Sequence, residues 1–253
     1  MKAIFLAVVL AAGLSGPAAA DVIELRAGPW CPYTCDPAGE RPGVLVELAR
    51  EALAPFGHQV NYETLNWARS LKQVERGDID GVIGIVPAEA PSLIQGPPMA
   101  PFVHAIAWRR GEARAVSSPQ HLAGLTVGAI NGYAYLGPVR AYIDANRNDR
   151  ARVQFTSGED ALTRNLQKLA ARRVDLVPDV RAVLEYALAT TPRGPQFSIV
   201  DMSWGQHVSI AFSPRRGRSK TYAGQLSEGL KTLQASGRYH EILAAYGLST
   251  PVD

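Results

Sequence analysis

The clearest pattern in the chain is a short unit of helix, turn and strand that occurs twice. In residues 71–86 (LKQVERGDIDGVIGIV), apolar residues recur at helical spacing, Gly77 suits the positive φ of a helix end, and an apolar run then predicts a buried strand. Residues 166–180 (LQKLAARRVDLVPDV) repeat this order with the same spacing, so that Asp175 takes the place of Asp80. Two similar α/β lobes with a ligand cleft between them are the natural interpretation.

Strands and helices alternate in the rest of the chain as well. The predicted strands cover residues 22–27, 59–65, 104–109, 125–130, 152–155, 198–202 and 207–212. The predicted helices cover residues 43–56, 158–172, 180–188, 222–233 and 239–246, with one more that opens at Trp67 and another that ends at Ile143. A loop at residues 111–119 follows the proline-rich stretch and the strand at 104–109, and we expect it to be the first crossover between the lobes, with 207–212 as the return crossover.

The N-terminal residues have the pattern of a secretory signal. Met1 and Lys2 precede an apolar segment at residues 3–14, which is too short to span a bilayer, and small residues end at Ala20. We therefore expect residues 1–20 to be a cleavable signal peptide and the mature chain to start at Asp21. Export to a bacterial periplasm fits best, and no other segment is apolar enough to span a membrane.

Composition and charge narrow the class of protein. The chain has 253 residues, of which 47% are hydrophobic and 19% are charged, so a folded protein with one large domain or two lobes is expected. The formal charge of +3 is small. Basic residues gather only at 215–220, where a solvated loop is favoured over contact with anionic lipid or nucleic acid. We expect no nucleic-acid partner.

Cys31 and Cys35 are the two cysteines of the chain. In an oxidising compartment they are expected to form a disulfide, which would stiffen the segment that carries Trp30 and Tyr33. A zinc site would need more ligands, and the five histidines show no metal spacing. The spacing also differs from the Cys-x-x-Cys of redox proteins. We therefore expect neither a metal nor a cofactor.

Seven segments carry a resemblance to a known family. In chain order they are GPWCPY, PGVLVELAREAL, GDIDGVIG, HAIAWRRG, LAGLTVGAINGYAY, VDLVPDVRAVLEY and LKTLQASGRYHEILAAYGL. Together they resemble the family 3 bacterial extracellular solute-binding proteins, the periplasmic amino-acid-binding components of ABC transporters. The resemblance implies a two-lobed periplasmic-binding fold of type II, in which each lobe is a mixed, mostly parallel sheet flanked by helices and two crossover strands join the lobes. We assign residues 21–109 and 208–253 to lobe 1 and residues 110–207 to lobe 2.

The resemblance also implies ligand contacts on lobe 1. In the family, the loop after the first strand packs an aromatic ring on the ligand, which makes Trp30 and Tyr33 candidates, although Trp30 also suits a core. Trp67 and Arg69 follow the second strand. Arg69 would either clamp a carboxylate or lie in solvent.

The first turn of lobe 2 supplies further candidates. Backbone N–H groups at the start of a helix favour an anionic group, and a glycine followed by two tyrosines is poor sequence for a helix core. The candidates are Asn131, Gly132, Tyr133 and Tyr135.

Two positions depart from the family pattern. Where amino-acid binders have Thr-Pro-Glu-Arg, residues 87–90 read Pro-Ala-Glu-Ala, which keeps Glu89 as a candidate contact but puts Ala90 in place of the arginine that grips the α-carboxylate. The aspartate that meets an ammonium group in the family has Asp179 as its nearest counterpart, offset by one position. Asp179 would face the cleft or cap the helix that follows it.

These observations favour a monomeric periplasmic binding protein. It would capture a small polar solute, amino-acid-like or carrying another carboxylate or amine, by closing its lobes, and deliver it to an ABC permease of the inner membrane. One alternative is a free-standing sensory or accessory binding module. Another is a dehydratase-like enzyme with Glu89 or Asp179 as general acid. Because the sequence shows no Ser-His-Asp order, phosphate loop or convincing carboxylate pair, we expect no enzymatic activity.

Overall fold

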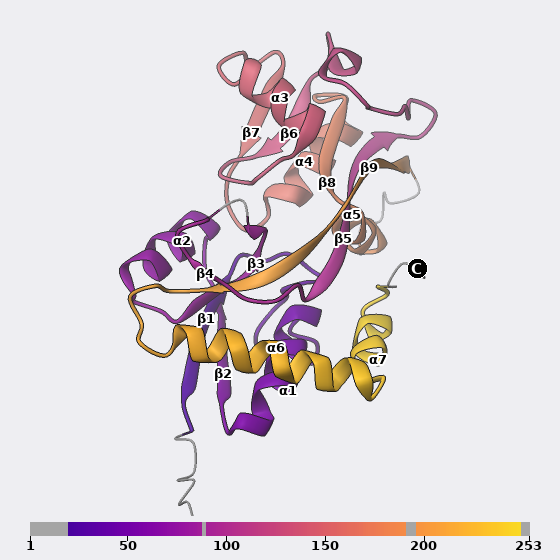
Figure 1. Cartoon of the computed structure of the whole chain (residues 1–253). Coiled ribbons are helices and arrows are strands. Elements are labelled where there is room, and N and C mark those ends of the chain that lie inside the picture. The colour runs from indigo at the N-terminus through magenta and orange to yellow at the C-terminus, as the bar shows by residue number, and fades with distance from the viewer. Residues whose placement is uncertain (1–19, 88–89, 191–195, 249–253) are drawn as a thin grey trace, which may run out of the picture.

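Short apolar strands alternate with amphipathic helices and build the two lobes seen in Figure 1. The computed structural model describes residues 20–87, 90–190 and 196–248. The strands are β1 (Val22–Ala27), β2 (Gln59–Thr64), β3 (Gly81–Ile85), β4 (Ile94–Gln95), β5 (Ala100–Arg109), β6 (Val127–Ile130), β7 (Val153–Thr156), β8 (Leu176–Val180) and β9 (Phe197–Phe212). The helices are α1 (Val44–Leu53), α2 (Trp67–Arg76), α3 (Gly137–Ala145), α4 (Ala161–Ala170), α5 (Arg181–Ala189), α6 (Ser219–Ala235) and α7 (Arg238–Ala245), with short 3₁₀ helices η1 (Ala54–Phe56) and η3 (Pro119–Leu122).

The strands form a mixed sheet in the order β2-β1-β3-β9-β5-β8-β6-β7, and β4 also pairs with β9. In lobe 1, β1 pairs with β2 and β3 in parallel, and in lobe 2, β6 pairs with β7 and β8 in parallel. Between these two groups, β9 and β5 run antiparallel to their neighbours. The predicted α/β fold of two lobes with two crossover strands is confirmed.

The strands β5 and β9 carry the chain from one lobe to the other (Figure 1). β9 pairs with β5 through residues 197–208 and with β3 through residues 209–212. The sequence pattern predicts two separate strands in this part of the chain. The structure has one, because the pairing with β5 continues on both sides of a register shift.

The first passage between the lobes also differs from the expectation. Residues 104–108 of β5 already pair with β8 of lobe 2, so β5 makes this passage before the chain reaches the loop at 111–119. We therefore propose that lobe 2 begins within β5, in place of the boundary between residues 109 and 110. The return boundary between residues 207 and 208 stays a proposal, and it agrees with the start of the β3 pairing at Ser209.

The repeated unit occurs in both lobes, as α2 followed by β3 and as α4 followed by β8. The Asp80 carboxylate accepts the backbone N–H of Glu24 at 2.9 Å, and the Asp80 N–H donates to the Glu24 carbonyl at 3.0 Å. Asp175 makes the same reciprocal pair with Thr126, at 2.8 and 2.7 Å. The equal spacing in the sequence thus reflects an equal role, since each aspartate ties its strand to the neighbouring parallel strand.

An arginine that follows or ends a crossover strand completes each of these ties. Arg216, which follows β9, lies 3.4 Å from the Asp80 carboxylate, and Arg109, which ends β5, lies 3.1 Å from the Asp175 carboxylate. The two guanidinium groups also donate to backbone carbonyls at or beyond the ends of α2 and α4, namely those of Gly77, Asp78, Leu169 and Val174. The basic tract at 215–220 therefore has at least one structural member.

We expect the replacement of Asp80 by alanine to lower the free energy of unfolding by about 2–3 kcal/mol. The substitution leaves the Glu24 N–H without its side-chain acceptor in a site where the aspartate is only 5% exposed. Urea unfolding followed by tryptophan fluorescence measures the loss. Asp78→Ala is the matched control, because its ion pair with Arg76 lies in solvent and should contribute less than about 1 kcal/mol. Equal losses in the two variants would contradict the role given to Asp80.

Each lobe has its own buried side chains, and the cluster of lobe 1 extends to Val180 and Val183 of lobe 2. In lobe 1, α1, α6 and α7 pack together on the sheet (Figure 1), and their buried side chains include Leu45, Leu48, Leu53, Leu226, Leu230, Tyr239 and Ile242. In lobe 2 the buried side chains include Trp108, Leu122, Val139, Ile143, Leu166, Leu169 and Leu176. None of the helices in the described part of the chain combines the length and the apolar character needed to cross a bilayer. Residues 1–19, which hold most of the predicted signal peptide, lie outside the described residues.

Candidate functional site

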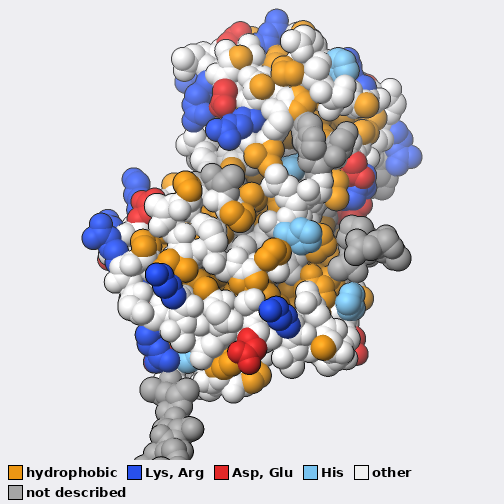
Figure 2. All heavy atoms as spheres, viewed as in Figure 1, with side chains coloured by type: hydrophobic (Ala, Val, Ile, Leu, Met, Phe, Trp, Pro, Cys, Tyr) orange, Lys and Arg blue, Asp and Glu red, His pale blue; other side chains and the backbone are white. Residues whose placement is uncertain are grey.

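A cavity of about 330 Å³ lies between the lobes. Its walls come from the segments that follow β1, β2 and β3 in lobe 1 and β6, β7 and β8 in lobe 2. These are the carboxyl ends of the parallel strands, where open α/β sheets generally bind ligands. In the space-filling view the molecule narrows at this level, and hydrophobic side chains gather there (Figure 2).

The loop after β1 brings an aromatic ring into the cavity. Its ends are held by the predicted Cys31–Cys35 disulfide, which is present, and by backbone hydrogen bonds between Trp30 and Thr34 at 2.7 and 3.1 Å. The Trp30 ring stacks on Tyr33 with ring centroids 4.5 Å apart and meets the edge of Phe102 at 6.2 Å. The position of Trp30 is therefore determined by the cross-linked loop and by the rings that pack behind it.

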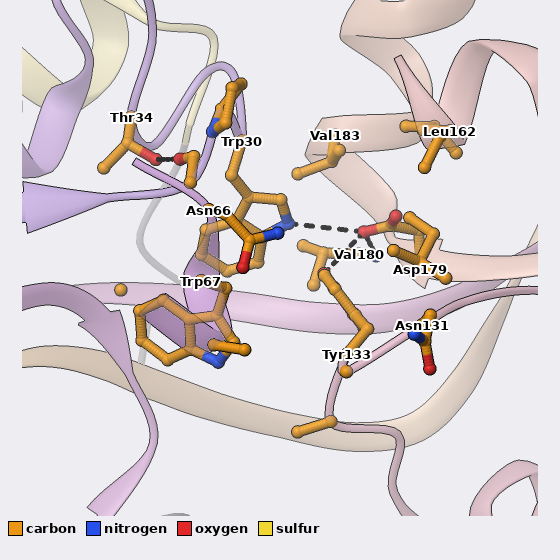
Figure 3. A pocket seen from close by; sticks show the side chains of 18 of the residues that line it. Trp30, Thr34, Asn66, Trp67, Asn131, Tyr133, Leu162, Asp179, Val180 and Val183 are labelled. Carbon is orange, nitrogen blue, oxygen red and sulfur yellow. Dashed lines mark hydrogen bonds between the residues drawn. The ribbon is translucent and has the colours of Figure 1, made fainter. Parts of the chain in front are cut away.

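Asp179 is the buried charge of the site. Its Oδ1 accepts hydrogen bonds from the Trp30 indole at 3.3 Å, from the Tyr133 hydroxyl at 2.8 Å and from the Val180 N–H at 2.7 Å. Figure 3 shows the indole and the phenol reaching this carboxylate from opposite lobes. Burial raises the pKa of Asp179 to about 6, against the opposing effect of the three hydrogen bonds. The Trp30 contact therefore links lobe 1 to the end of β8 in lobe 2.

Two of the predicted tyrosines lie behind the cavity wall. Tyr33 is 1% exposed and donates its hydroxyl to the Pro101 carbonyl at 2.9 Å, and Tyr135 accepts the Ile130 N–H at 2.7 Å. Burial raises the pKa of both hydroxyls above their ordinary range, so they stay protonated. They support Trp30 and Tyr133 instead of lining the site.

The structure brings six of the ten predicted site residues to the cavity, and these are Trp30, Trp67, Asn131, Gly132, Tyr133 and Asp179. Arg69 is exposed on α2 and is not among the residues that line the cavity. Glu89 lies outside the described residues. Ala90 packs in the core of lobe 1 with Val74 and Leu93.

Sequence reasoning missed several lining residues. Phe102 and His104 line the cavity from β5, which carries the chain between the lobes. His104 is 6% exposed, lies against the Phe102 ring at 5.0 Å, and has no hydrogen-bond partner for its Nε2 among the described residues. Burial lowers the pKa of His104 to about 4, so the ring is neutral at neutral pH. The sequence did contain a signal for this residue, because His104 is a polar side chain at the start of a predicted strand that is otherwise apolar.

Two backbone N–H groups of the turn after β6, where the sequence predicts an anion site, already have partners. The Asn131 N–H donates to the Thr156 carbonyl at 2.9 Å and the Tyr133 N–H to the Ile130 carbonyl at 3.3 Å, so neither is left for a ligand. α3 begins only at Gly137. Within the described residues, no group of three histidine, cysteine or acidic side chains is arranged to hold a metal ion. The cavity is thus suited to bind a small molecule through aromatic faces and one buried carboxylate.

No known protein family matches the sequence of the chain, and no curated protein matches it. Solved structures do match its fold. One was described with glutathione import through GshT and the cystine ABC importer TcyBC of Streptococcus mutans (TM-score 0.75, 16% identity, 92% of this chain and 98% of that chain).

Two further solved structures with this fold come from proteins with other roles. One is a histidine kinase sensor domain with similarity to periplasmic binding proteins (TM-score 0.72, 23% identity, 89% of this chain and 95% of that chain). The other is an ancestral amino-acid-binding protein, a precursor of cyclohexadienyl dehydratase (TM-score 0.67, 16% identity, 89% and 95%). At these identities the likeness shows the fold of two-lobed periplasmic binding proteins and leaves ligand and partner open.

Proposed function

We propose that this two-lobed protein is a periplasmic solute-binding protein that captures a small polar ligand in the cleft for an ABC importer of the inner membrane. The observation that carries the proposal is the cavity between the lobes, with aromatic walls from both and one buried carboxylate. The predicted signal peptide and the importer-associated neighbour support the location and the partner. A monomer is sufficient, since one chain supplies both walls.

Hinge closure is the proposed mechanism. Trp30 and Trp67 belong to lobe 1, Tyr133 and Asp179 belong to lobe 2, and β5 and β9 join the lobes. A ligand that contacts both walls binds the closed form better than the open form and shifts the population toward it. The closed form would then be the form that an importer recognises.

A sensory module is the second candidate, because a sensor domain shares the fold. An enzyme is not proposed. Asp179 is a buried carboxylate. The other acidic side chain among the described lining residues is that of Glu159, which is exposed to solvent. General acid–base chemistry ordinarily needs a proton donor placed with a partner.

A thermal-shift screen of residues 21–253 tests ligand capture. The probes are amino acids, polyamines, short dicarboxylates, sugars and aromatic acids. A ligand that binds only the folded protein, at about 100 times its dissociation constant, adds about 2.7 kcal/mol to the free energy of unfolding, which is a readable shift. The absence of any shift across these classes would contradict the proposed function.

Replacing Trp67 with alanine should weaken binding of a ligand found in this screen at least tenfold, or about 1.4 kcal/mol. The indole lines the cavity from the start of α2, and its removal takes away a contact face for the ligand, while its partly exposed position at the margin of a core cluster limits the loss of packing. Isothermal titration calorimetry measures the change. Tyr186→Ala removes an aromatic ring that is 47% exposed and does not line the cavity, and it should leave affinity unchanged.

A further inference from the structure

We infer that the cleft selects organic cations that lack a carboxylate group, such as amines and quaternary ammonium compounds with an apolar body. This inference rests on the proposed function and names the ligand class of the same site. It differs from the α-amino acids that the family resemblance suggests.

The charges around the cavity are of one sign. Its described lining contains two carboxylates, Asp179 and Glu159, and neither lysine nor arginine. The lining histidine, His104, is neutral at neutral pH. Two cations near the cavity have partners elsewhere: Arg181 pairs with Asp201 and Glu185, and Lys168 donates to Thr156 and Asn165. No lysine or arginine among the described lining residues is therefore in place to meet a ligand carboxylate.

Asp179 has room for a cation. The residue is 3% exposed, and all three described hydrogen bonds end on Oδ1, which leaves Oδ2 for a ligand. An ionised carboxylate that is buried without a positive partner is costly, so a ligand that brings the positive charge gains the interaction that the protein lacks.

The other walls suit the rest of such a ligand. Trp30, Trp67 and Tyr133 present aromatic rings, which attract a cation over their faces, most strongly for tryptophan. Apolar side chains complete the surface, among them Val86, Leu136, Leu162, Val180 and Val183. Figure 3 shows Leu162 and Val183 on the Asp179 side of the cavity and Trp67 on the other side. A charged head at Asp179 would therefore leave an apolar body between hydrophobic walls.

Three of the helix starts at the cavity, those of α2, α3 and α4, are poorly suited to bind an anion, and at the fourth, that of α5, Asp179 already supplies negative charge. At α2, the Asn66 side chain accepts the Arg69 N–H at 3.3 Å. At α3, Pro138 stands in the first turn and has no N–H. At α4, Glu159 and Asp160 precede the helix and already supply negative charge. A ligand carboxylate would thus be buried without a positively charged partner among the described lining residues, which disfavours amino acids.

The test compares ligands that differ by one carboxylate group. Calorimetry is run with cadaverine and lysine, with phenethylamine and phenylalanine, and with choline and glycine betaine. We expect at least one cation to bind, and to bind at least tenfold more tightly than its carboxylate partner. Asp179→Asn should weaken that binding at least tenfold while circular dichroism stays unchanged. Asp160→Asn is the control, since this aspartate is exposed and does not line the cavity, and it should weaken binding less than twofold.

Other outcomes separate the two proposals. Equal or tighter binding of the carboxylate partners would overturn the cation inference and leave solute binding intact. Binding of none of the six, with a neutral sugar or a dicarboxylate bound in the wider screen, would overturn the inference alone. No binding in either experiment would overturn both.

Discussion

Replacing Gly229 with alanine should lower the free energy of unfolding by about 3 kcal/mol or more, or prevent folding. A Cβ built at this position of α6 would lie 2.0 Å from the carbonyl oxygen of Ala52 in α1 and 2.6 Å from its carbonyl carbon. Both atoms belong to the backbone, so no side-chain rotation relieves the overlap. The two helices must move apart, and the core of lobe 1 then loses contacts along their whole interface.

The same helix provides a matched control for this experiment. Gly224 also lies in α6, but a Cβ there would meet nothing within 4 Å. Gly224→Ala should therefore stabilise the protein by about 0.5–1 kcal/mol through helix propensity alone. Urea unfolding of the two variants and the wild type gives the comparison. If Gly229→Ala were as stable as Gly224→Ala, the close approach of α1 and α6 would be wrong.

The second large effect concerns pH, because two buried groups at the site titrate in opposite ways. Burial raises the pKa of Asp179 from 3.8 to about 6, so this group contributes stability below pH 3.8 that is lost as pH rises through 6. Burial lowers the pKa of His104 from 6.5 to about 4, so this group contributes stability above pH 6.5 that is lost as pH falls through 4. Each effect is on the order of 3 kcal/mol, and in the wild type they oppose each other over nearly the same range.

Substituting one of the two groups should therefore reveal how the free energy of unfolding depends on pH through the other. Between pH 4 and pH 6.5, the stability of Asp179→Asn should rise with pH relative to wild type, and the stability of His104→Gln should fall. The asparagine oxygen can still accept hydrogen bonds at the position of Oδ1, so the first variant is expected to fold. Ligand-free urea unfolding at several pH values measures both slopes, and the other titrating groups cancel in the comparison with wild type. Parallel curves for the three proteins would contradict the burial of these two groups.

Local pattern was sufficient to predict most elements of this fold. β1 was predicted with its observed ends, and the repeated unit revealed two lobes, since the spacing between a helix and a buried aspartate is preserved where that aspartate ties two strands together. The disulfide followed from two nearby cysteines and an oxidising compartment. These features depend on residues that are close in the sequence or on a contact that occurs twice, and both leave a pattern that can be recognised in the sequence.

The predictions that differ from the structure concern features that depend on tertiary contacts. Two strands were expected in place of β9, but pairing with β5 continues through residues 197–208 and joins them into one. Helical periodicity did not say which side of α2 faces the cleft, so it left Arg69 open between a ligand contact and solvent, and the structure places it in solvent while Trp67 lines the cavity. His104 was overlooked because its role depends on β5 passing between the lobes.

The division of lobe 1 between the two ends of the chain has a consequence for biosynthesis. A nascent chain that has emerged through β8 lacks both β9, which pairs with β3, and α6, which packs against α1. Until β9 and α6 emerge, the N-terminal third of the chain exposes the apolar face of α1 and the unpaired edge of β3. Exposed surfaces of this kind are bound by chaperones and attacked by proteases. Lobe 2, whose strands and helices lie close together in sequence, needs only the first part of β9 to complete its sheet. The order of synthesis thus makes the lobe that begins the chain the last one to close.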